Sequence, residues 1–128
     1  KKTIKLDSAN LHEPQICEND IKSVVKNLKS SFVSSVGEEI NDFEKAICQY
    51  TGSSYAIATC NGTSALHTCL LVNKIKIKDE VLVPSLTFVA TANAIKYCGS
   101  IPHFVDTEMN SLGIDVDKLE IYLKKKTS

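Results

Sequence analysis

Short apolar runs alternate with segments of helical periodicity from residue 55 onward. The strand-like runs are 55–59, 80–83 and 101–105, and the helical patterns are 63–73, 87–98 and 115–125. Strands separated by helices of this length pair in parallel through crossover connections, because tight hairpins join only antiparallel strands. The sequence therefore predicts an α/β fold, a mostly parallel sheet flanked by helices.

Two more helices are predicted ahead of this alternating region. The first is indicated by apolar residues at helical spacing, which are Ile21, Val24, Val25 and Leu28. Small and β-branched residues interrupt the pattern over 30–37, and a second helix follows over 38–50, with Gly52 marking its end. We expect residues 1–37 to form an N-terminal helix and loop, and residues 38–128 to form the beginning of a larger domain.

The run Asn61–Leu66 follows the first strand-like segment and predicts a turn that opens a helix. The first N–H groups of a helix have no partner within it and carry partial positive charge, so they attract anions such as phosphate. Gly62 permits close approach, and Thr63 and Ser64 add hydroxyl donors. A hydroxyl residue after glycine is also typical of an ordinary helix cap, and the residues alone leave that alternative open.

In parallel sheets, ligands bind at the carboxyl ends of the strands. Residues 61–64, residues 85–88 and Asp106 each follow a predicted strand. We therefore expect these three segments to meet at one edge of the sheet.

Charge and cysteine content exclude several classes of function. The 128-residue chain has 15 basic and 15 acidic residues, a balance that does not suit a nucleic-acid binder. Its five cysteines include no closely spaced pair of the kind found in zinc sites and disulfide scaffolds, which favours reduced thiols in a cytoplasmic protein. No apolar run approaches the ~20 residues that span a bilayer, so no membrane partner is expected.

Two longer motifs complete the pattern, Asp79–Ile95 and Tyr97–Asp106. Together with Asn61–Leu66, they closely resemble the DegT/DnrJ/EryC1/StrS family of sugar aminotransferases, and the resemblance extends over roughly residues 30–123. It implies part of the large domain of a fold-type I aminotransferase, with pyridoxal 5′-phosphate (PLP) as cofactor.

The resemblance also implies roles for particular residues. Gly62, Thr63 and Ser64 are expected to bind the cofactor phosphate, and Phe88 to lie against its ring. An ordinary core aromatic is the alternative for Phe88.

A loop over residues 32–37 resembles the segment that contacts the substrate near the mouth of the active site in this family. The expected contacts are Ser34, Ser35, Val36 and Gly37. A plain linker is the alternative for this loop.

The catalytic residues of the family have no counterpart here. The Schiff-base lysine and the carboxylate that pairs with the pyridine nitrogen are expected beyond Ser128, in a longer protein of which this chain is an N-terminal piece. Asp106 is expected to be a cap or turn former. Four lysines near the predicted strands do not match the position of the family's catalytic lysine, and the three histidines have neither metal-ligand spacing nor an expected catalytic role. These residues are Lys74, Lys76, Lys78, Lys96, His12, His67 and His103.

The implied activity is transfer of an amino group, from glutamate by family habit, to a keto carbon of a nucleotide-linked 4-keto-6-deoxy sugar in bacterial surface-glycan biosynthesis. The residues of these motifs are most similar to those of the branch acting on UDP-linked 4-keto-6-deoxy-N-acetylhexosamines, as in legionaminic acid and bacillosamine synthesis. The full-length protein is expected to be a homodimer. Two alternatives stay open: a sugar dehydratase of the same family using pyridoxamine phosphate, and a non-catalytic α/β module that binds a phosphorylated ligand.

Overall fold

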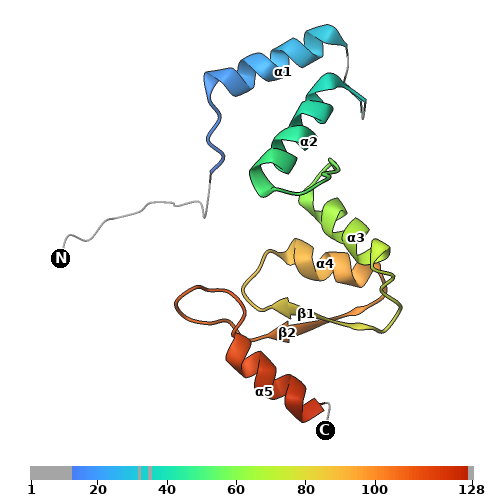
Figure 1. Cartoon of the computed structure of the whole chain (residues 1–128), viewed down its shortest axis with the longest axis vertical. Helices are drawn as coiled ribbons and strands as arrows, with labels where there is room; N and C mark the ends of the chain where they lie inside the picture. The colour runs from blue at the N-terminus through green and yellow to red at the C-terminus, as the bar shows by residue number, and fades with distance from the viewer. Residues whose placement is uncertain (1–12, 32, 35, 127–128) are drawn as a thin grey trace, which may run out of the picture. The chain divides into compact units, whose positions relative to one another are not determined.

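The computed structural model describes residues 13–31, 33–34 and 36–126 (Figure 1). The backbone divides into two compact units, residues 1–58 and residues 59–128. The domain boundary expected after residue 37 lies inside the first unit and stays a prediction. Within the described residues, no helix has the length and apolar character needed to cross a membrane.

The first unit contains the two predicted helices, α1 (Glu18–Ser30) and α2 (Glu38–Thr51). At the start of α1, the Cys17 N–H donates to Asp20 Oδ2 over 2.8 Å. At the end of α2, Gly52 adopts a φ of 75° and its N–H donates to the Cys48 carbonyl over 2.9 Å. A positive φ is easily reached only by glycine, which confirms Gly52 as the end of the helix.

The predicted strand at 55–59 is wrong for this structure, which assigns no strand there. The side chains alternate as in a strand, because Tyr55 and Ile57 are exposed while Ala56 and Ala58 are half-buried. A strand also needs a neighbouring backbone, and the described residues offer this segment only a side chain: Glu44 Oε1 accepts the Ala58 N–H over 2.7 Å.

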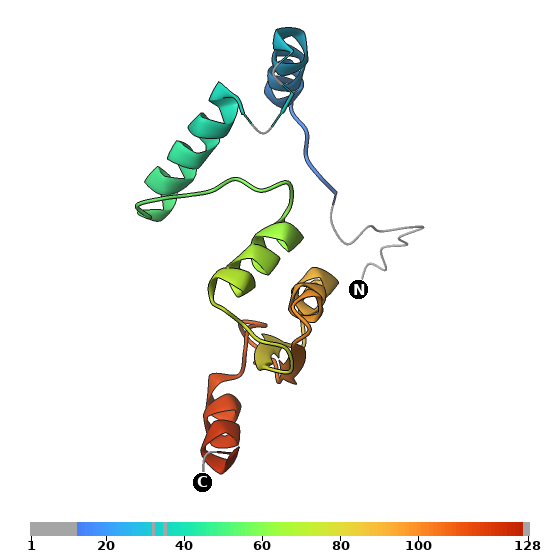
Figure 2. The ribbon, with the colours of Figure 1, turned by 90° about the vertical axis from the view of Figure 1, so that its right-hand side faces the viewer.

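The second unit contains the predicted alternation of helices and strands. In chain order these are α3 (Gly62–Val72), β1 (Glu80–Pro84), α4 (Val89–Tyr97), β2 (Ile101–Val105) and α5 (Val116–Lys126). The two strands pair in parallel, with Val83 opposite Phe104. Helices α3 and α4 lie on one side of the strand pair and α5 on the other (Figures 1 and 2). The structure confirms the predicted α/β fold with a parallel sheet flanked by helices.

The core of the second unit lies between α4 and the two strands. Its buried apolar side chains are Val83, Ala94, Ile95 and Val105. Ser100 is fully buried with them, and its hydroxyl donates to the Lys76 carbonyl over 2.8 Å. This bond satisfies a polar group that would otherwise be costly to bury. The core therefore fixes α4 on the sheet, and α4 in turn positions the residue that precedes it, Phe88.

Candidate active site

The beginnings of α3 and α4 meet at one open pocket of about 660 Å³. Its lining residues are Asn61, Gly62, Thr63, Ala65, Leu66, Phe88, Ala90 and Thr91. The structure thus brings Gly62 and Thr63 together with Phe88, residues that are far apart in the sequence. None of the lining residues is charged, and two helix N-termini contribute partial positive charge to the pocket.

The start of α3 leaves two backbone donors available. The Asn61 side chain accepts the Ser64 N–H over 2.8 Å, and the Asn61 carbonyl accepts the Ala65 N–H over 3.1 Å. Within the described part of the chain, the N–H groups of Gly62 and Thr63 make no hydrogen bond. These two donors at the positive end of the helix suit an anion such as a phosphate group.

Gly62 leaves open space in front of these donors. A Cβ built on Gly62 would have no atom within 4 Å. A ligand oxygen could therefore approach the backbone here as closely as hydrogen bonding requires. The arrangement fits the phosphate of PLP by its donors, its charge and its space.

Ser64 is placed differently from its two predicted partners. Its N–H is already used by the Asn61 side chain, and its hydroxyl lies 3.3 Å from the sulfur of Cys60. Ser64 is also absent from the residues that line the pocket. The three residues of the predicted phosphate site therefore differ in this structure. Gly62 and Thr63 line the pocket, while Ser64 makes contacts that support the turn.

Phe88 directly precedes the first residue of α4 and lines the opposite side of the pocket. Its side chain is 72% exposed in this structure, so the alternative of a core aromatic does not describe it here. No side chain caps this end of α4, although the hydroxyls of Thr87 and Thr91 lie 3.1 Å apart across the first turn. An exposed ring beside an anion site suits the flat pyridine ring of PLP.

Sequence reasoning missed Thr91, Ala90 and Leu66 as lining residues. Thr91 follows Phe88 by three residues, a spacing that places it beside Phe88 at the start of α4. That spacing was the available signal.

The loop predicted to contact the substrate belongs to the first unit. Ser34 Oγ accepts the Val36 N–H over 3.2 Å. Val36 and Gly37 line a separate hollow of about 480 Å³ together with residues at the end of α1 and the start of α2. Ser35 lies outside the described residues. Substrate contact by this loop stays a prediction.

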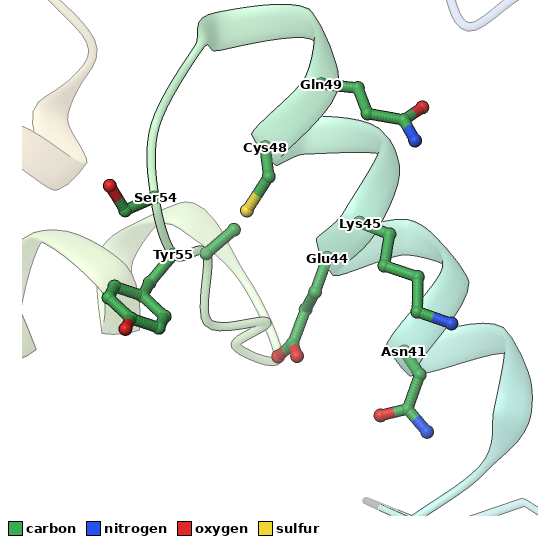
Figure 3. A pocket seen from close by; sticks show the side chains of 8 residues that line it. Asn41, Glu44, Lys45, Cys48, Gln49, Ser54 and Tyr55 are labelled. Atoms are coloured by element: carbon green, nitrogen blue, oxygen red, sulfur yellow. The ribbon is translucent and has the colours of Figure 1, made fainter.

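A second hollow in the first unit separates α2 from the extended segment that follows it (Figure 3). Figure 3 shows Glu44 and Cys48 projecting from α2 on the side where Ser54 and Tyr55 lie. Because Glu44 accepts the Ala58 N–H, its carboxylate fixes this segment to the helix. We assign Glu44 a structural role.

Asp106 makes structural contacts with the start of α5, although the side chain that accepts a backbone N–H there belongs to Asp115. The Asp106 carbonyl accepts the Asp115 N–H over 2.9 Å, and the Asp106 carboxylate accepts a hydrogen bond from Lys118 Nζ over 3.1 Å. This hydrogen bond is the main reason that the pKa of Lys118 is raised, and a second one to Asp115 adds to it. Asp106 therefore ties the end of β2 to the start of α5.

Among the described residues, the histidines and lysines with no expected catalytic role are absent from the lining of the pocket. His67 contacts the Tyr97 ring edge-on, with ring centroids 5.7 Å apart, and His103 lies 5.0 Å from the Tyr122 ring. All four lysines set aside from the sequence are exposed: Lys74, Lys76, Lys78 and Lys96. Within the part of the chain that the structure describes, no group of three metal-binding side chains occurs. His12 lies outside that part.

Comparison with known proteins gives consistent relatives. The profile of the DegT/DnrJ/EryC1/StrS aminotransferase family matches residues 14–128. GDP-perosamine synthase of Caulobacter vibrioides is 41% identical over 114 residues, which are 89% of this chain and 31% of that protein. The UDP-4-amino-4-deoxy-L-arabinose–oxoglutarate aminotransferase of Shewanella sediminis is 35% identical over 91% of this chain and 30% of its own length.

Solved structures agree with these relatives. Spr1654 from Streptococcus pneumoniae, described as a sugar aminotransferase, superposes in its pyridoxamine phosphate form with a TM-score of 0.74 and 31% identity. The alignment covers 84% of this chain and 27% of that one, and the same protein has also been solved in its PLP form. The chain spans about a third of the length of the curated relatives it matches. By profile, sequence and structure, it belongs to the DegT/DnrJ/EryC1/StrS aminotransferase family.

Proposed function

We propose that this chain forms the phosphate-binding and ring-binding side of the cofactor site in a PLP-dependent aminotransferase that acts on a nucleotide-linked 4-keto-6-deoxy sugar. The observation that carries the proposal is the pocket between α3 and α4. Two unbonded N–H groups, from Gly62 and Thr63, lie there with the exposed ring of Phe88. Family membership supports the choice of PLP over other phosphorylated ligands.

When bound, PLP supplies an electron sink that lets an amino group pass from a donor to a keto carbon. The residues of this chain hold and orient the cofactor for that chemistry. The N–H groups of Gly62 and Thr63 hold the phosphate, and Phe88 restricts the tilt of the ring and excludes water from one of its faces. The covalent and proton-transfer steps belong to residues that we place in the later part of the full-length protein.

The names of the relatives support the proposed substrate class. Their names include both GDP-linked and UDP-linked sugars, and one relative is the spore coat polysaccharide protein SpsC of Bacillus subtilis. We propose an amino sugar destined for a surface glycan as the product, and glutamate as the amino donor. The residues of the motifs favour the branch acting on UDP-linked N-acetylhexosamines, whereas three of the relatives are GDP-perosamine synthases. Both nucleotides must therefore be tested.

The test uses the full-length protein. Purified enzyme is incubated with PLP, reduced with borohydride and weighed by mass spectrometry, and a mass increase of one phosphopyridoxyl group per chain is expected. Glutamate is then supplied with a GDP-linked or a UDP-linked 4-keto-6-deoxy sugar, and the amino sugar product is measured.

Three results would contradict parts of this proposal. Loss of the sugar 3-hydroxyl without amine transfer would identify a dehydratase. Cofactor binding without turnover of either sugar would exclude the proposed substrate class. No PLP adduct and no turnover would leave only the phospholigand-binding module.

We further propose a cytoplasmic homodimer. The five cysteines are all free thiols, which are typical of reducing compartments. Sedimentation of the full-length protein tests the dimer, and a monomer at micromolar concentration would exclude it.

A further inference from the structure

We propose that Asn61 is a positioning residue for the cofactor phosphate, because its neutral side chain decides which backbone donors at the start of α3 face the ligand. The inference rests on the proposed function and adds a residue to the same site. Sequence and family resemblance pointed to Gly62, Thr63 and Ser64 as the cradle, and the structure divides that set.

The division is made by the Asn61 side chain. Its backbone is extended, with φ −167° and ψ 168°, and Oδ1 accepts the Ser64 N–H over 2.8 Å. The third donor of the helix is therefore consumed by the cap, while the first two, from Gly62 and Thr63, stay unbonded within the described residues. Of these three backbone donors, the first two remain available to an anion.

The other end of the Asn61 amide is held as well. Nδ2 lies 3.5 Å from the sulfur of Cys60, and that sulfur lies 3.3 Å from the Ser64 hydroxyl. The Asn61 carbonyl also accepts the Thr59 hydroxyl over 2.9 Å. These contacts fix the turn from both sides, so the two free N–H groups are held in place before any ligand arrives.

The chemistry of the cap is specific to a neutral residue. Aspartate caps helices as well as asparagine does, and it would accept the Ser64 N–H equally well. Its carboxylate would, however, place a negative charge among the lining residues, none of which is charged. A phosphate would then meet repulsion in the pocket. Asparagine gives the cap without the charge.

The experiment compares three substitutions in the full-length protein: Asn61→Asp, Asn61→Ser and Asn61→Ala. PLP dissociation constants are measured by equilibrium dialysis, and melting temperatures by calorimetry without added PLP. Asn61→Asp should melt as the unsubstituted protein does, yet bind PLP about tenfold more weakly because of charge repulsion. Asn61→Ser keeps a neutral cap, so its melting temperature should be unchanged and its PLP dissociation constant should stay within about threefold. Asn61→Ala loses the cap, so its melting temperature should fall and its PLP binding should weaken.

Asn73 supplies a matched control at the other end of the same helix, where its Nδ2 donates to the Cys69 carbonyl over 2.8 Å. Asn73→Ala should lower the melting temperature without weakening PLP binding. Binding of inorganic phosphate to the PLP-free protein gives a second readout, and Asn61→Asp should weaken it.

Several outcomes would overturn the inference. Unchanged PLP affinity in Asn61→Asp would overturn the inference and leave the proposed function intact. Equal losses of PLP affinity in Asn61→Ala and Asn73→Ala, at equal loss of stability, would do the same. Failure of the unsubstituted protein to bind PLP would overturn the proposed function, and the inference with it.

Discussion

The two helices that begin at the pocket begin in opposite ways. At α3 a polar side chain, Asn61, caps the first turn, and glycine follows it. At α4 the corresponding residue is Phe88, which makes no capping hydrogen bond and leaves its ring largely exposed. The start of α3 has a side-chain cap and two free backbone donors, whereas the start of α4 has no cap and exposes an aromatic ring.

With these two different helix starts, one pocket can contact two unlike parts of a ligand. A cap at the first position of α4 would contribute about 1 kcal/mol to stability. Phe88 forgoes that contribution in a helix that the buried Ala94 and Ile95 already hold on the sheet. Residues that break a local rule are often functional, which supports the cofactor contact proposed for Phe88.

Gly62→Asp should have the largest effect, and it would break the α3 side of the comparison. A carboxylate in front of the two free N–H groups repels phosphate by roughly 4 kcal/mol at ~4 Å, so we expect a hundredfold or greater loss of PLP affinity. The fold should survive, because a Cβ at Gly62 meets no atom within 4 Å and acidic residues suit the first turn of a helix. Dialysis and circular dichroism measure the two effects.

Val116→Asp is the matched control for that substitution. It places the same charge at the first residue of α5, and Val116 is 70% exposed. Equal losses of PLP affinity in both variants would show that net charge, and not the pocket, is responsible.

Phe88→Asn should have an intermediate effect, and it would make the two helix starts alike. The new cap should stabilise the protein by about 0.5–1 kcal/mol. Loss of the ring should weaken PLP binding by roughly tenfold, since an aromatic contact contributes about 0.5–1.5 kcal/mol beyond the area it buries. Urea unfolding and PLP titration measure the two changes. Phe88→Ala should show the same loss of affinity without gain in stability, and unchanged affinity in both would remove Phe88 from the site.

Acidification should have the smallest effect, and the loop between β2 and α5 should report it clearly. Hydrogen bonds from the backbone and side chains of Asn110 and Ser111 lower the pKa of Glu108 to about 2, from 4.5. A lowered pKa stabilises the folded loop above pH 4.5, and this stabilisation disappears as the pH falls from 4.5 to about 2. The amide signals of Asn110 and Ser111 should therefore titrate near pH 2 in NMR spectra.

The helix starts provide the comparison within the same spectra, because their described contacts use no acidic side chain. Amide signals of Ser64 and Thr91 should stay constant over that range. Glu108→Gln should abolish the titration of the loop, and its persistence would assign it to another group.

The sequence predicted the second unit well because its pattern is local. Apolar runs at 80–83 and 101–105 with a helix between them leave few alternatives to a parallel pair, and β1 and β2 confirm this arrangement. Family membership is also confirmed. Cofactor binding by Gly62, Thr63, Ser64 and Phe88 and substrate contact by the loop at 34–37 stay predictions.

Two features depended on information that the pattern does not contain. The segment 55–59 has the alternation of a strand, yet a strand forms only beside another backbone, and Glu44 provides a single side-chain acceptor instead. The role of Ser64 depended on which residue adopts the extended backbone of a cap. Asn61 does so, and it takes the Ser64 N–H that the sequence had left for phosphate.

The buried core between α4 and the strands has a consequence for the order of folding. Its members, Val83, Ala94, Ile95 and Val105, all lie between the start of β1 and the end of β2. Contacts between residues so near in sequence cost little loop-closure entropy and form quickly. We therefore expect β1, α4 and β2 to act as the folding nucleus, so that Phe88 is in place before the chain adds the turn proposed to bind the anion.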